Sequence, residues 1–590
     1  MNVPADFMPP SPWGLRPEAS VPEAGRDIRD WGLSIDAPLT LEDPETHDWD
    51  EAADMIVVGL GGAGVAAALE GLERGLSVIA LDQYDGGGSS AANGGVFYAG
   101  GGTPIQREAG ISDDAQRMED YLRYEVGDVV SPETLRDFCE QSAGTVEWLQ
   151  RHGAPFEASY WPKKTSYPPL DKFLYHPDSS LAGPFRDLTP PAARGHRTVR
   201  RNGGKPWGLG AGIWEPLRQA ALNRGLVLHT QTEARQLALD SSGRVIGVRV
   251  ERFIDPAIRK RYSRHIAAAN KWIAMLSPTF PGARLTFAIG YRHLAKAKAL
   301  AVAGRTSAWV RARRGVVLSA GGFICNPDMV RHFAPDYSAG LPNGTLGDNG
   351  SGIMLGVSAG GKTALMERVS AWRFLSPPRA WGQALLVNGR GERYCNETWY
   401  GARIGDEMVE RNGGRGYIIM DRKLFRQSLR DAFGEGVLGF QRDITLVNAF
   451  FAAEKGPTPA ALAAKLGCDP ALLAANIAAY NRAARGEEPD RFHKSPDEMA
   501  VLDRGPYYAI DASVDARMFP IACMTVGGLS VDEKSGAVRR REGEDVVPGL
   551  YAAGRNAVGI CSNLYVSGLS YADCIYSGRR AARAISESGQ

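Results

Sequence analysis

A glycine cluster directly after a short apolar run constrains the fold of this chain more than any other feature. The run spans residues 54–58 and is rich in Ile and Val, as expected of a buried parallel strand. The cluster comprises Gly59, Gly61, Gly62, Ala63 and Gly64. Residues 65–73 then predict a helix, and residues 77–81 predict a second strand that ends at Asp82. This order predicts a βαβ unit, whose glycines allow a tight turn, close approach to a pyrophosphate and close helix packing.

A second loop, rich in Gly and Ser, indicates which dinucleotide binds. It spans residues 86–95, directly after the acid, and an NAD site does not need such a loop. FAD adds a ribityl chain and a flavin ring, which main-chain and hydroxyl donors of this loop could contact. A helix that starts near Ser570 would direct its positive end at the N1/C2 edge of the flavin. The sequence therefore predicts FAD as the cofactor.

The predicted FAD contacts outside the glycine cluster lie in the Gly/Ser loop and at the ends of expected strands. Asp82 is expected to accept hydrogen bonds from the ribose hydroxyls. The complete set is Asp82, Gln83, Ser89, Ser90, Asn93, Gly94, Gly95, Ala234, Ala320, Gly321, Gly554, Arg555, Leu569 and Ser570.

The length of 590 residues predicts more than one domain, because a single compact core seldom grows so large. We expect an α/β protein with a Rossmann-like FAD-binding domain and an inserted α+β substrate or catalytic domain. An N-terminal arm would be either disordered or wrapped on the protein as an extended segment. The predicted ranges are 1–49 for the arm, 50–365 and 506–590 for the FAD-binding domain, and 366–505 for the inserted domain.

Composition and charge exclude several functions. The formal net charge of +1 predicts no general attraction to nucleic acid. The seven cysteines show neither a C-x-x-C pair nor the spacing of metal ligands, so we expect no metal site and a cytoplasmic location. Residues 1–50 lack the apolar run of a signal peptide, and no stretch of about 20 apolar residues predicts a membrane span.

Two segments carry a resemblance to a known family, residues 94–106 and residues 565–570. Over about residues 50–590 the chain resembles the flavoprotein superfamily of fumarate reductase and the 3-ketosteroid dehydrogenases. The two segments are most similar to the 3-ketosteroid Δ4-dehydrogenases. This resemblance implies FAD-dependent oxidation of a saturated 3-ketosteroid to the 4-ene-3-ketosteroid, a small hydrophobic ketone as substrate, and an external electron acceptor that the sequence does not identify.

The resemblance also implies the catalytic residues. Tyr565 and Ser567, together with Tyr400 from the inserted domain, would remove a proton beside the ketone and pass it on. We favour Tyr565, as tyrosinate, for the base. The ketone oxygen needs donors where enolate charge develops, and we expect the main-chain N–H groups of Gly568 and Leu569 to supply them.

The same positions argue against a dicarboxylate substrate. Fumarate reductases hold two carboxylates with arginines and a histidine, whereas here residues 523–528 contain no histidine. Tyr400 and Tyr565 stand close to where that family has arginines. A buried dicarboxylate without cationic partners is strongly unfavourable. Three alternatives stay open: a Δ1-dehydrogenase, a fumarate reductase-like or other flavin oxidoreductase of enoates or ketones, and a flavin-binding protein without turnover in which both tyrosines are structural.

A basic insert interrupts the FAD-binding domain at residues 254–307. It carries ten Lys and Arg residues and one acid, Asp255, with aromatic and aliphatic residues between them. Such segments lie on anionic bilayer surfaces, and sterols partition into bilayers, so we expect peripheral contact with a membrane. The alternatives are a helical hairpin packed on the domain and a contact between copies of the chain.

Overall fold

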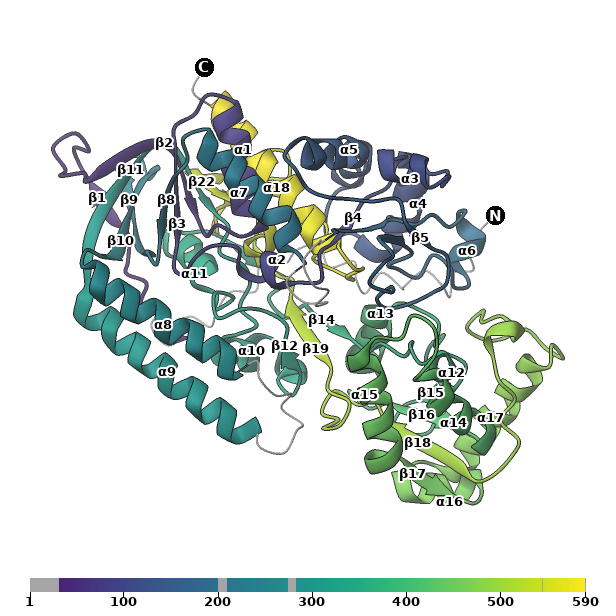
Figure 1. The fold of residues 1–590 in the computed structure, drawn as a ribbon. Helices are drawn as coiled ribbons and strands as arrows, with labels where there is room; N and C mark the ends of the chain where they lie inside the picture. The colour runs from purple at the N-terminus through teal and green to yellow at the C-terminus, as the bar shows by residue number, and fades with distance from the viewer. Residues whose placement is uncertain (1–30, 200–208, 274–282, 544, 589–590) are drawn as a thin grey trace.

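The computed structural model describes residues 31–199, 209–273, 283–543 and 545–588 (Figure 1). Most of the predicted arm and part of the basic insert lie outside these residues. The described end of the arm is an extended segment on the protein surface. Trp31 and Ile35 are buried, and β1 (Leu39–Leu41) pairs in parallel with β9.

One sheet of nine strands forms the core of the first unit (Figure 1). Its strands β8, β3, β2, β11 and β22 are parallel neighbours, while β9, β10 and β11 form an antiparallel meander. Residues 55–58 of β2 are buried, as the apolar run predicts. The strands after β1 are β2 (Glu51–Val58), β3 (Val78–Asp82), β8 (Val227–Thr230), β9 (Glu233–Asp240), β10 (Val245–Phe253), β11 (Arg305–Leu318), β21 (Ala537–Arg539) and β22 (Val546–Ala552).

Three helices lie side by side: α1 (Gly62–Glu73), α7 (Ala211–Asn223) and α18 (Leu569–Glu587). Helices α1 and α18 pack against the sheet, and α7 packs against α1. Helix α18 comes from the far end of the chain and lies beside α1 (Figure 1). The predicted βαβ unit is present, and the Rossmann-like α/β class is confirmed.

The second unit contains an antiparallel sheet of four strands in the order β15-β16-β18-β17. Strand β18 (Tyr507–Asp511) pairs with β16, so the predicted boundary at 505 falls before the last strand of this sheet. The other elements are β15 (Leu385–Val387), β16 (Tyr417–Met420), β17 (Glu454–Gly456), α12 (Arg379–Gly382), α13 (Gly401–Asp406), α14 (Arg422–Asp431), α15 (Gly439–Val447), α16 (Pro459–Leu466) and α17 (Pro470–Ala484).

Two smaller sheets lie between the units. The chain enters the second unit along β14 (Val369–Trp372) and returns along β19 (Ala522–Thr525), which pair with each other, and β12 (Leu341–Pro342) completes this sheet. The other sheet has the order β4-β7-β6-β5. Its strands are β4 (Val96–Tyr98), β5 (Tyr160–Trp161), β6 (Leu174–Tyr175) and β7 (Gly195–Arg197).

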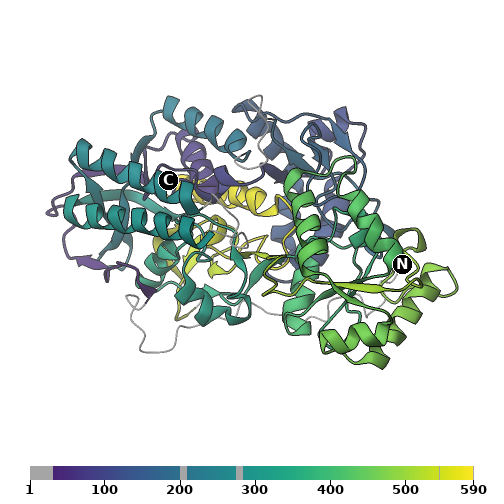
Figure 2. The same cartoon turned by 60° about the horizontal axis from the view of Figure 1, so that its bottom comes forward.

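The basic insert forms a helical hairpin of α8 (Pro256–Ile273) and α9 (Ala283–Gly304) between β10 and β11. Tyr262 and Ile266 of α8 pack against Phe253 and bury one face of the hairpin on the first unit. In both ribbon views the hairpin and the second unit lie at opposite ends of the molecule (Figures 1 and 2). No described helix is long and apolar enough to cross a bilayer.

The remaining elements complete the first unit. They are α2 (Gly88–Ala92), α3 (Pro104–Glu108), α4 (Ala115–Val126), α5 (Pro132–Arg151), α6 (Phe185–Leu188), α10 (Pro327–Phe333), α11 (Ser351–Ser358), β13 (Thr363–Ala364) and β20 (Gly528–Leu529).

Candidate active site

The glycine turn between β2 and α1 is packed too closely for side chains. A Cβ on Gly64 would lie 2.0 Å from the main-chain oxygen of Gly59, and a Cβ on Gly59 would lie 2.6 Å from Cα of Ala320. Gly59 also has a φ of +92°, which disfavours any other residue. Gly61 precedes the first turn of α1, and Gly62 donates its N–H to Oγ of Ser90 at 3.0 Å. The turn therefore holds the helix N-terminus against the Gly/Ser loop.

Asp82 joins the glycine turn to that loop. Its carboxylate accepts hydrogen bonds from the N–H groups of Leu60 at 2.9 Å, Tyr84 at 2.8 Å and Gly86 at 3.2 Å. Burial raises the pKa of Asp82, and the three amide donors oppose that shift. The carboxylate therefore orders both loops, and its expected contact with a ribose remains a prediction.

A buried ion pair connects two distant parts of the predicted FAD site. Nη2 of Arg555 lies 2.7 Å from Oδ1 of Asp348, whose other oxygen bonds the hydroxyl of Ser89. The main-chain N–H of Thr345 also donates to Asp348, at 2.8 Å. The sequence reasoning missed Asp348. Its position in the glycine-rich turn of residues 347–352 was the available signal.

Unpaired donors in this region fit a dinucleotide. Nη1 of Arg555 and Nδ2 of Asn556 are buried and have no hydrogen-bond partner among the described residues. Both residues follow β22 in the chain. Oδ1 of Asn556 accepts a hydrogen bond from the N–H of Ala320 at 2.9 Å. Oxygen and nitrogen atoms of FAD would satisfy such donors, because buried polar groups are normally hydrogen-bonded.

The other predicted FAD contacts lie near these groups in the fold. Oδ1 of Asn93 accepts from the N–H of Gly95 at 2.8 Å, and the carbonyl of Gly94 accepts from the Tyr167 hydroxyl at 2.8 Å. The rest lie at strand ends and helix starts: Gln83 after β3, Ala63 in α1, Ala234 in β9, Gly321 after β11, Gly554 after β22, and Leu569 and Ser570 at the start of α18.

The predicted catalytic residues come together between the two units. The ring centroids of Tyr400 and Tyr565 are 6.5 Å apart. Burial raises the pKa of both tyrosines, and the hydroxyl of Ser567 opposes that rise. The same hydroxyl accepts a hydrogen bond from the hydroxyl of Tyr175 at 3.2 Å. Tyr175 lies in β6, and the sequence reasoning missed it because no motif or spacing separates it from the other tyrosines of its segment.

Tyr565 is held by a stacked ring and by one main-chain donor. Its ring stacks on Trp372 with centroids 4.9 Å apart and planes 14° apart. The N–H of Gly568 donates to the Tyr565 hydroxyl at 3.1 Å. Burial raises the pKa of Tyr565 to about 12, and the Gly568 N–H opposes that rise. The neutral phenol is therefore favoured at ordinary pH, and the Gly568 N–H reduces the cost of forming the tyrosinate.

Two main-chain amides of the predicted site have hydrogen-bond partners within the chain. The N–H of Leu569 donates to the carbonyl of Val566 at 3.0 Å, and the N–H of Gly568 is bonded to Tyr565. Both amides are engaged within the chain, and their expected role as donors to a ketone oxygen stays a prediction.

Tyr400 precedes α13 and is fixed at its main chain. Its N–H donates to Oγ of Ser179 at 2.8 Å, and Phe374 meets its ring edge-on at a centroid distance of 5.4 Å. Burial raises the pKa of Tyr400 well above its ordinary value, and the neighbouring Tyr565 and Tyr175 raise it further. Tyr400 is therefore neutral at ordinary pH and suited to donating a hydrogen bond.

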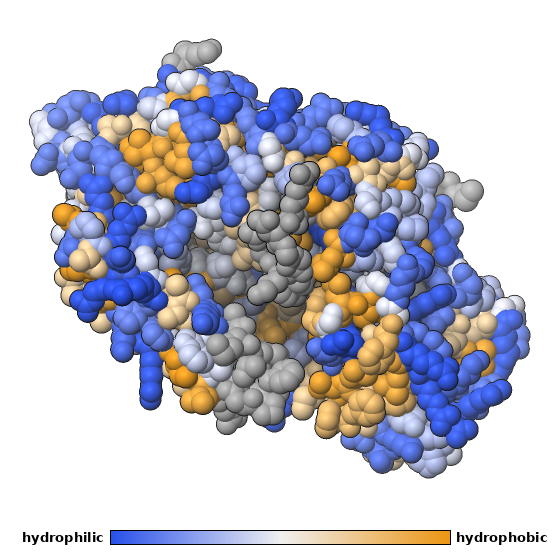
Figure 3. Space-filling view, viewed as in Figure 1, coloured by the Kyte–Doolittle hydropathy of each residue, from blue (hydrophilic) through white to orange (hydrophobic). Residues whose placement is uncertain are grey.

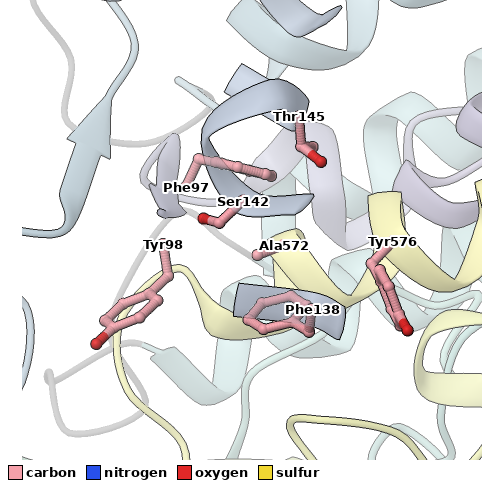
Figure 4. A pocket seen from close by; sticks show the side chains of 7 residues that line it. All are labelled: Phe97, Tyr98, Phe138, Ser142, Thr145, Ala572 and Tyr576. Carbon is pink, nitrogen blue, oxygen red and sulfur yellow. The ribbon is translucent and has the colours of Figure 1, made fainter. Parts of the chain in front are cut away.

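A cavity of about 570 Å³ opens beside this cluster. Tyr400, Phe374 and Trp399 line it, together with residues 163–166 and 434–437. Its volume suits a drug-sized ligand. A second void, of about 10 Å³, lies among residues of β4, α5 and α18 (Figure 4) and has room for about one water molecule.

Buried arginines near the units' junction are already engaged. Arg368 pairs with Asp406 at 3.3 Å, and Arg403 pairs with Glu125 at 2.9 Å. Arg373 donates to main-chain carbonyls, including that of Phe519 at 2.7 Å. Each of the three is engaged by a carboxylate or by main-chain carbonyls, and of their buried nitrogens only the Nε atoms of Arg373 and Arg403 lack a partner among the described residues.

Comparison with known proteins identifies the family. A profile described as "FAD binding domain" matches residues 54–567. The chain belongs to this FAD-binding family. Its cofactor is FAD, as the sequence predicts, and the family comprises oxidoreductases such as the relatives below.

The similarity to steroid dehydrogenases covers nearly the whole chain. A 3-oxo-5-alpha-steroid 4-dehydrogenase of Comamonas testosteroni is 36% identical over 525 residues, which are 88% of this chain and 95% of that protein. The structure of a 3-ketosteroid-delta4-(5alpha)-dehydrogenase from Rhodococcus jostii, in complex with 4-androstene-3,17-dione, is 27% identical with a TM-score of 0.75 and covers 93% of this chain and 99% of that one. The expected resemblance is confirmed.

A Δ1-dehydrogenase shares the fold at lower similarity. The 3-ketosteroid delta1-dehydrogenase from Sterolibacterium denitrificans has a TM-score of 0.61 and 20% identity, and covers 91% of this chain and 100% of that chain.

Proposed function

We propose that this flavoprotein oxidises a saturated 3-ketosteroid to the 4-ene-3-ketosteroid. The observation that carries the proposal is the convergence of Tyr565, Tyr400 and Tyr175 on the hydroxyl of Ser567, beside a cavity large enough for a steroid. The similarity to two Δ4-dehydrogenases supports the same reaction.

The proposed reaction removes two hydrogens from adjacent carbons of the steroid A ring. Tyr565 takes the proton from C4, because the Gly568 N–H and the Ser567 hydroxyl both stabilise its anion. Bound FAD would supply the hydride acceptor for C5, so that loss of the C4 proton and the C5 hydride leaves a double bond between C4 and C5.

The proton then moves from Tyr565 through the hydroxyl of Ser567. Tyr175 and Tyr400 are the next phenols along this route, since Ser567 bonds Tyr175 directly and lowers the pKa of Tyr400. Such a chain of hydroxyls carries a proton in either direction without a charged side chain.

Anaerobic bleaching of the bound flavin tests the proposal. Saturated 3-ketosteroids of the 5α and 5β series should reduce the flavin and yield the 4-ene product. Reduction by a 4-ene-3-ketosteroid with formation of a 1,4-diene would favour the Δ1 reaction, and reduction by succinate alone would refute a steroid substrate. A flavin that no substrate reduces would indicate a binding protein without turnover.

The basic hairpin supports a finer proposal, peripheral contact with an anionic membrane. Exposed basic residues line α8 and α9: Arg259, Lys260, Arg261, Arg264, Lys271, Arg292, Lys296 and Lys298. Beside them Leu285, Tyr291 and Val302 are 67%, 61% and 89% exposed. The hairpin's region of the surface mixes hydrophilic and hydrophobic side chains (Figure 3). Basic and apolar groups together bind anionic lipid surfaces.

Deletion of the hairpin tests this contact cleanly. Phe253 of β10 pairs directly with Arg305 of β11, so a short turn can replace residues 256–304 without changing the strand register. Co-sedimentation with vesicles that contain phosphatidylserine should fall after the deletion, and binding equal to that of the intact protein would refute the contact. In this proposal the protein works in the cytoplasm, and its seven free cysteines fit a reducing compartment.

A further inference from the structure

One buried cation in the wall of the 570 Å³ cavity lacks a partner. Nζ of Lys164 is buried and makes no hydrogen bond to any described residue. The adjacent Lys163, also in the wall, is exposed and pairs with Glu435 at 2.9 Å. The two neighbouring lysines therefore differ in that only Lys164 holds an uncompensated buried charge.

The charged groups that face Lys164 are already paired elsewhere. Glu498 lies 3.5 Å from Arg186, and Lys494 lies 2.8 Å from Glu397. Asp178 accepts hydrogen bonds from the Tyr98 hydroxyl at 3.0 Å and from the Ser180 N–H at 3.0 Å. Glu498 and Asp178 stabilise the ammonium at a distance and Lys494 opposes it, but none of them bonds Nζ.

Burial dominates the titration of this side chain. It lowers the pKa of Lys164 to about 7, against the weaker attraction of Glu498 and Asp178. A buried ammonium without a counter-ion is unfavourable, and a ligand anion placed beside it would remove the penalty. The protein alone offers no such anion at Nζ within its described residues.

We infer that Lys164 binds a carboxylate on the substrate, so that the preferred substrate is a 3-ketosteroid with an acidic side chain. This inference rests on the proposed function. Of the catalytic cluster, Tyr400 lines the same cavity as Lys164, so a steroid whose A ring meets Tyr400 can extend into that cavity. A carboxylate is the group that forms a charge-assisted bond with an ammonium.

A carboxylate site at Lys164 should give the wild-type protein a measurable preference for the acid over its methyl ester. A hydrogen bond between charged groups is worth enough to change a specificity constant about 10- to 100-fold. The acid should therefore be a better substrate than its methyl ester by about that factor. The preference should weaken as the pH rises above 7, because free Lys164 then loses its proton.

The test compares one saturated 3-ketosteroid acid with its methyl ester in four proteins: the wild-type holoenzyme, Lys164→Met, Lys164→Arg and Lys465→Met. In Lys164→Met, kcat/KM for the acid should fall about 10- to 100-fold and that for the ester should change little. Lys164→Arg should keep the preference at pH 9, where the wild type loses it, because guanidinium stays charged. Lys465→Met is the matched control, because this exposed lysine of α16 pairs with Glu454 outside the cavity, and it should behave as wild type.

Two results would overturn the inference: equal use of acid and ester by the wild type, or an equal loss for both substrates in Lys164→Met, which would indicate a structural role. Calorimetric binding of the 4-ene product acid and its ester provides the same comparison without turnover. If neither substrate reduces the flavin, the proposed function fails, while selective binding of the acid that disappears in Lys164→Met would still support the carboxylate site.

Discussion

Replacement of Tyr565 by Phe isolates the one hydroxyl on which the proposed chemistry depends. The ring should keep its stacking on Trp372, at a centroid distance of 4.9 Å, because Phe has the same planar face. The substitution removes the acceptor of the Gly568 N–H, and an unsatisfied buried donor costs about 1–3 kcal/mol of stability. The variant should therefore fold and retain FAD, although with reduced stability.

The rate effect should be much larger than the stability effect. General base catalysis contributes about 10²- to 10⁴-fold, so the rate constant of flavin reduction should fall by that factor. With a pKa of about 12, only about one Tyr565 in 10⁴ is ionised at pH 8. The base works deprotonated, so the wild-type rate should rise about tenfold per pH unit up to that pKa, and Tyr565→Phe should lose this dependence.

Anaerobic stopped-flow absorbance with a saturated 3-ketosteroid measures both quantities. Tyr576→Phe is the matched control, because that tyrosine of α18 donates its hydroxyl to Asp137 at 2.7 Å, outside the catalytic cluster. It should change the rate less than about threefold. A Tyr565→Phe variant that binds FAD normally and reduces it within threefold of the wild-type rate would refute the role of Tyr565.

Three further predictions concern the relay and the cofactor site. Ser567→Ala removes a group that lowers the pKa of the phenols, so the pH–rate profile should move to higher pH and the rate at pH 8 should fall about tenfold; an unshifted profile would contradict the relay. Gly64→Ala places a Cβ 2.0 Å from a main-chain oxygen and should abolish FAD retention, which absorbance at 450 nm measures. The control Gly144→Ala lies in open space on α5 and should stabilise that helix by about 1 kcal/mol, which thermal unfolding measures. Asp348→Ala leaves the Arg555 charge buried and unpaired, and should lower the free energy of unfolding by about 3–5 kcal/mol in urea titrations; a loss below 1 kcal/mol would contradict the importance of the pair.

The sequence predicts the parts of this protein that depend on local pattern. The glycine spacing at residues 59–64 determines the βαβ unit, because close packing there excludes other residues. Helices α16 and α17 begin at Pro459 and Pro470, directly after the N-caps Thr458 and Asp469, which are start signals that the sequence carries. Such signals lie within a few residues of the element that they specify.

Contacts between distant segments were not predictable in this way. Tyr175 reaches Ser567 across 392 positions of the chain, and Asp348 reaches Ser89 across 259. The occupation of the Gly568 amide by Tyr565 depends on a positive φ of +89° at Gly568, which fixes the direction of the turn. A motif identifies which residues belong to a site, while the fold decides which atoms of those residues remain available.

The stacking of Trp372 on Tyr565 connects the second unit of the molecule with the first. Trp372 ends the strand by which the chain enters the second unit, whereas Tyr565 precedes the last helix of the first. A rotation of the second unit that widened the cavity for a rigid steroid would carry Trp372 and Tyr400 away from Tyr565. Substrate could then enter only while the two units are apart and the catalytic cluster is incomplete. The reaction would take place only after the units had closed.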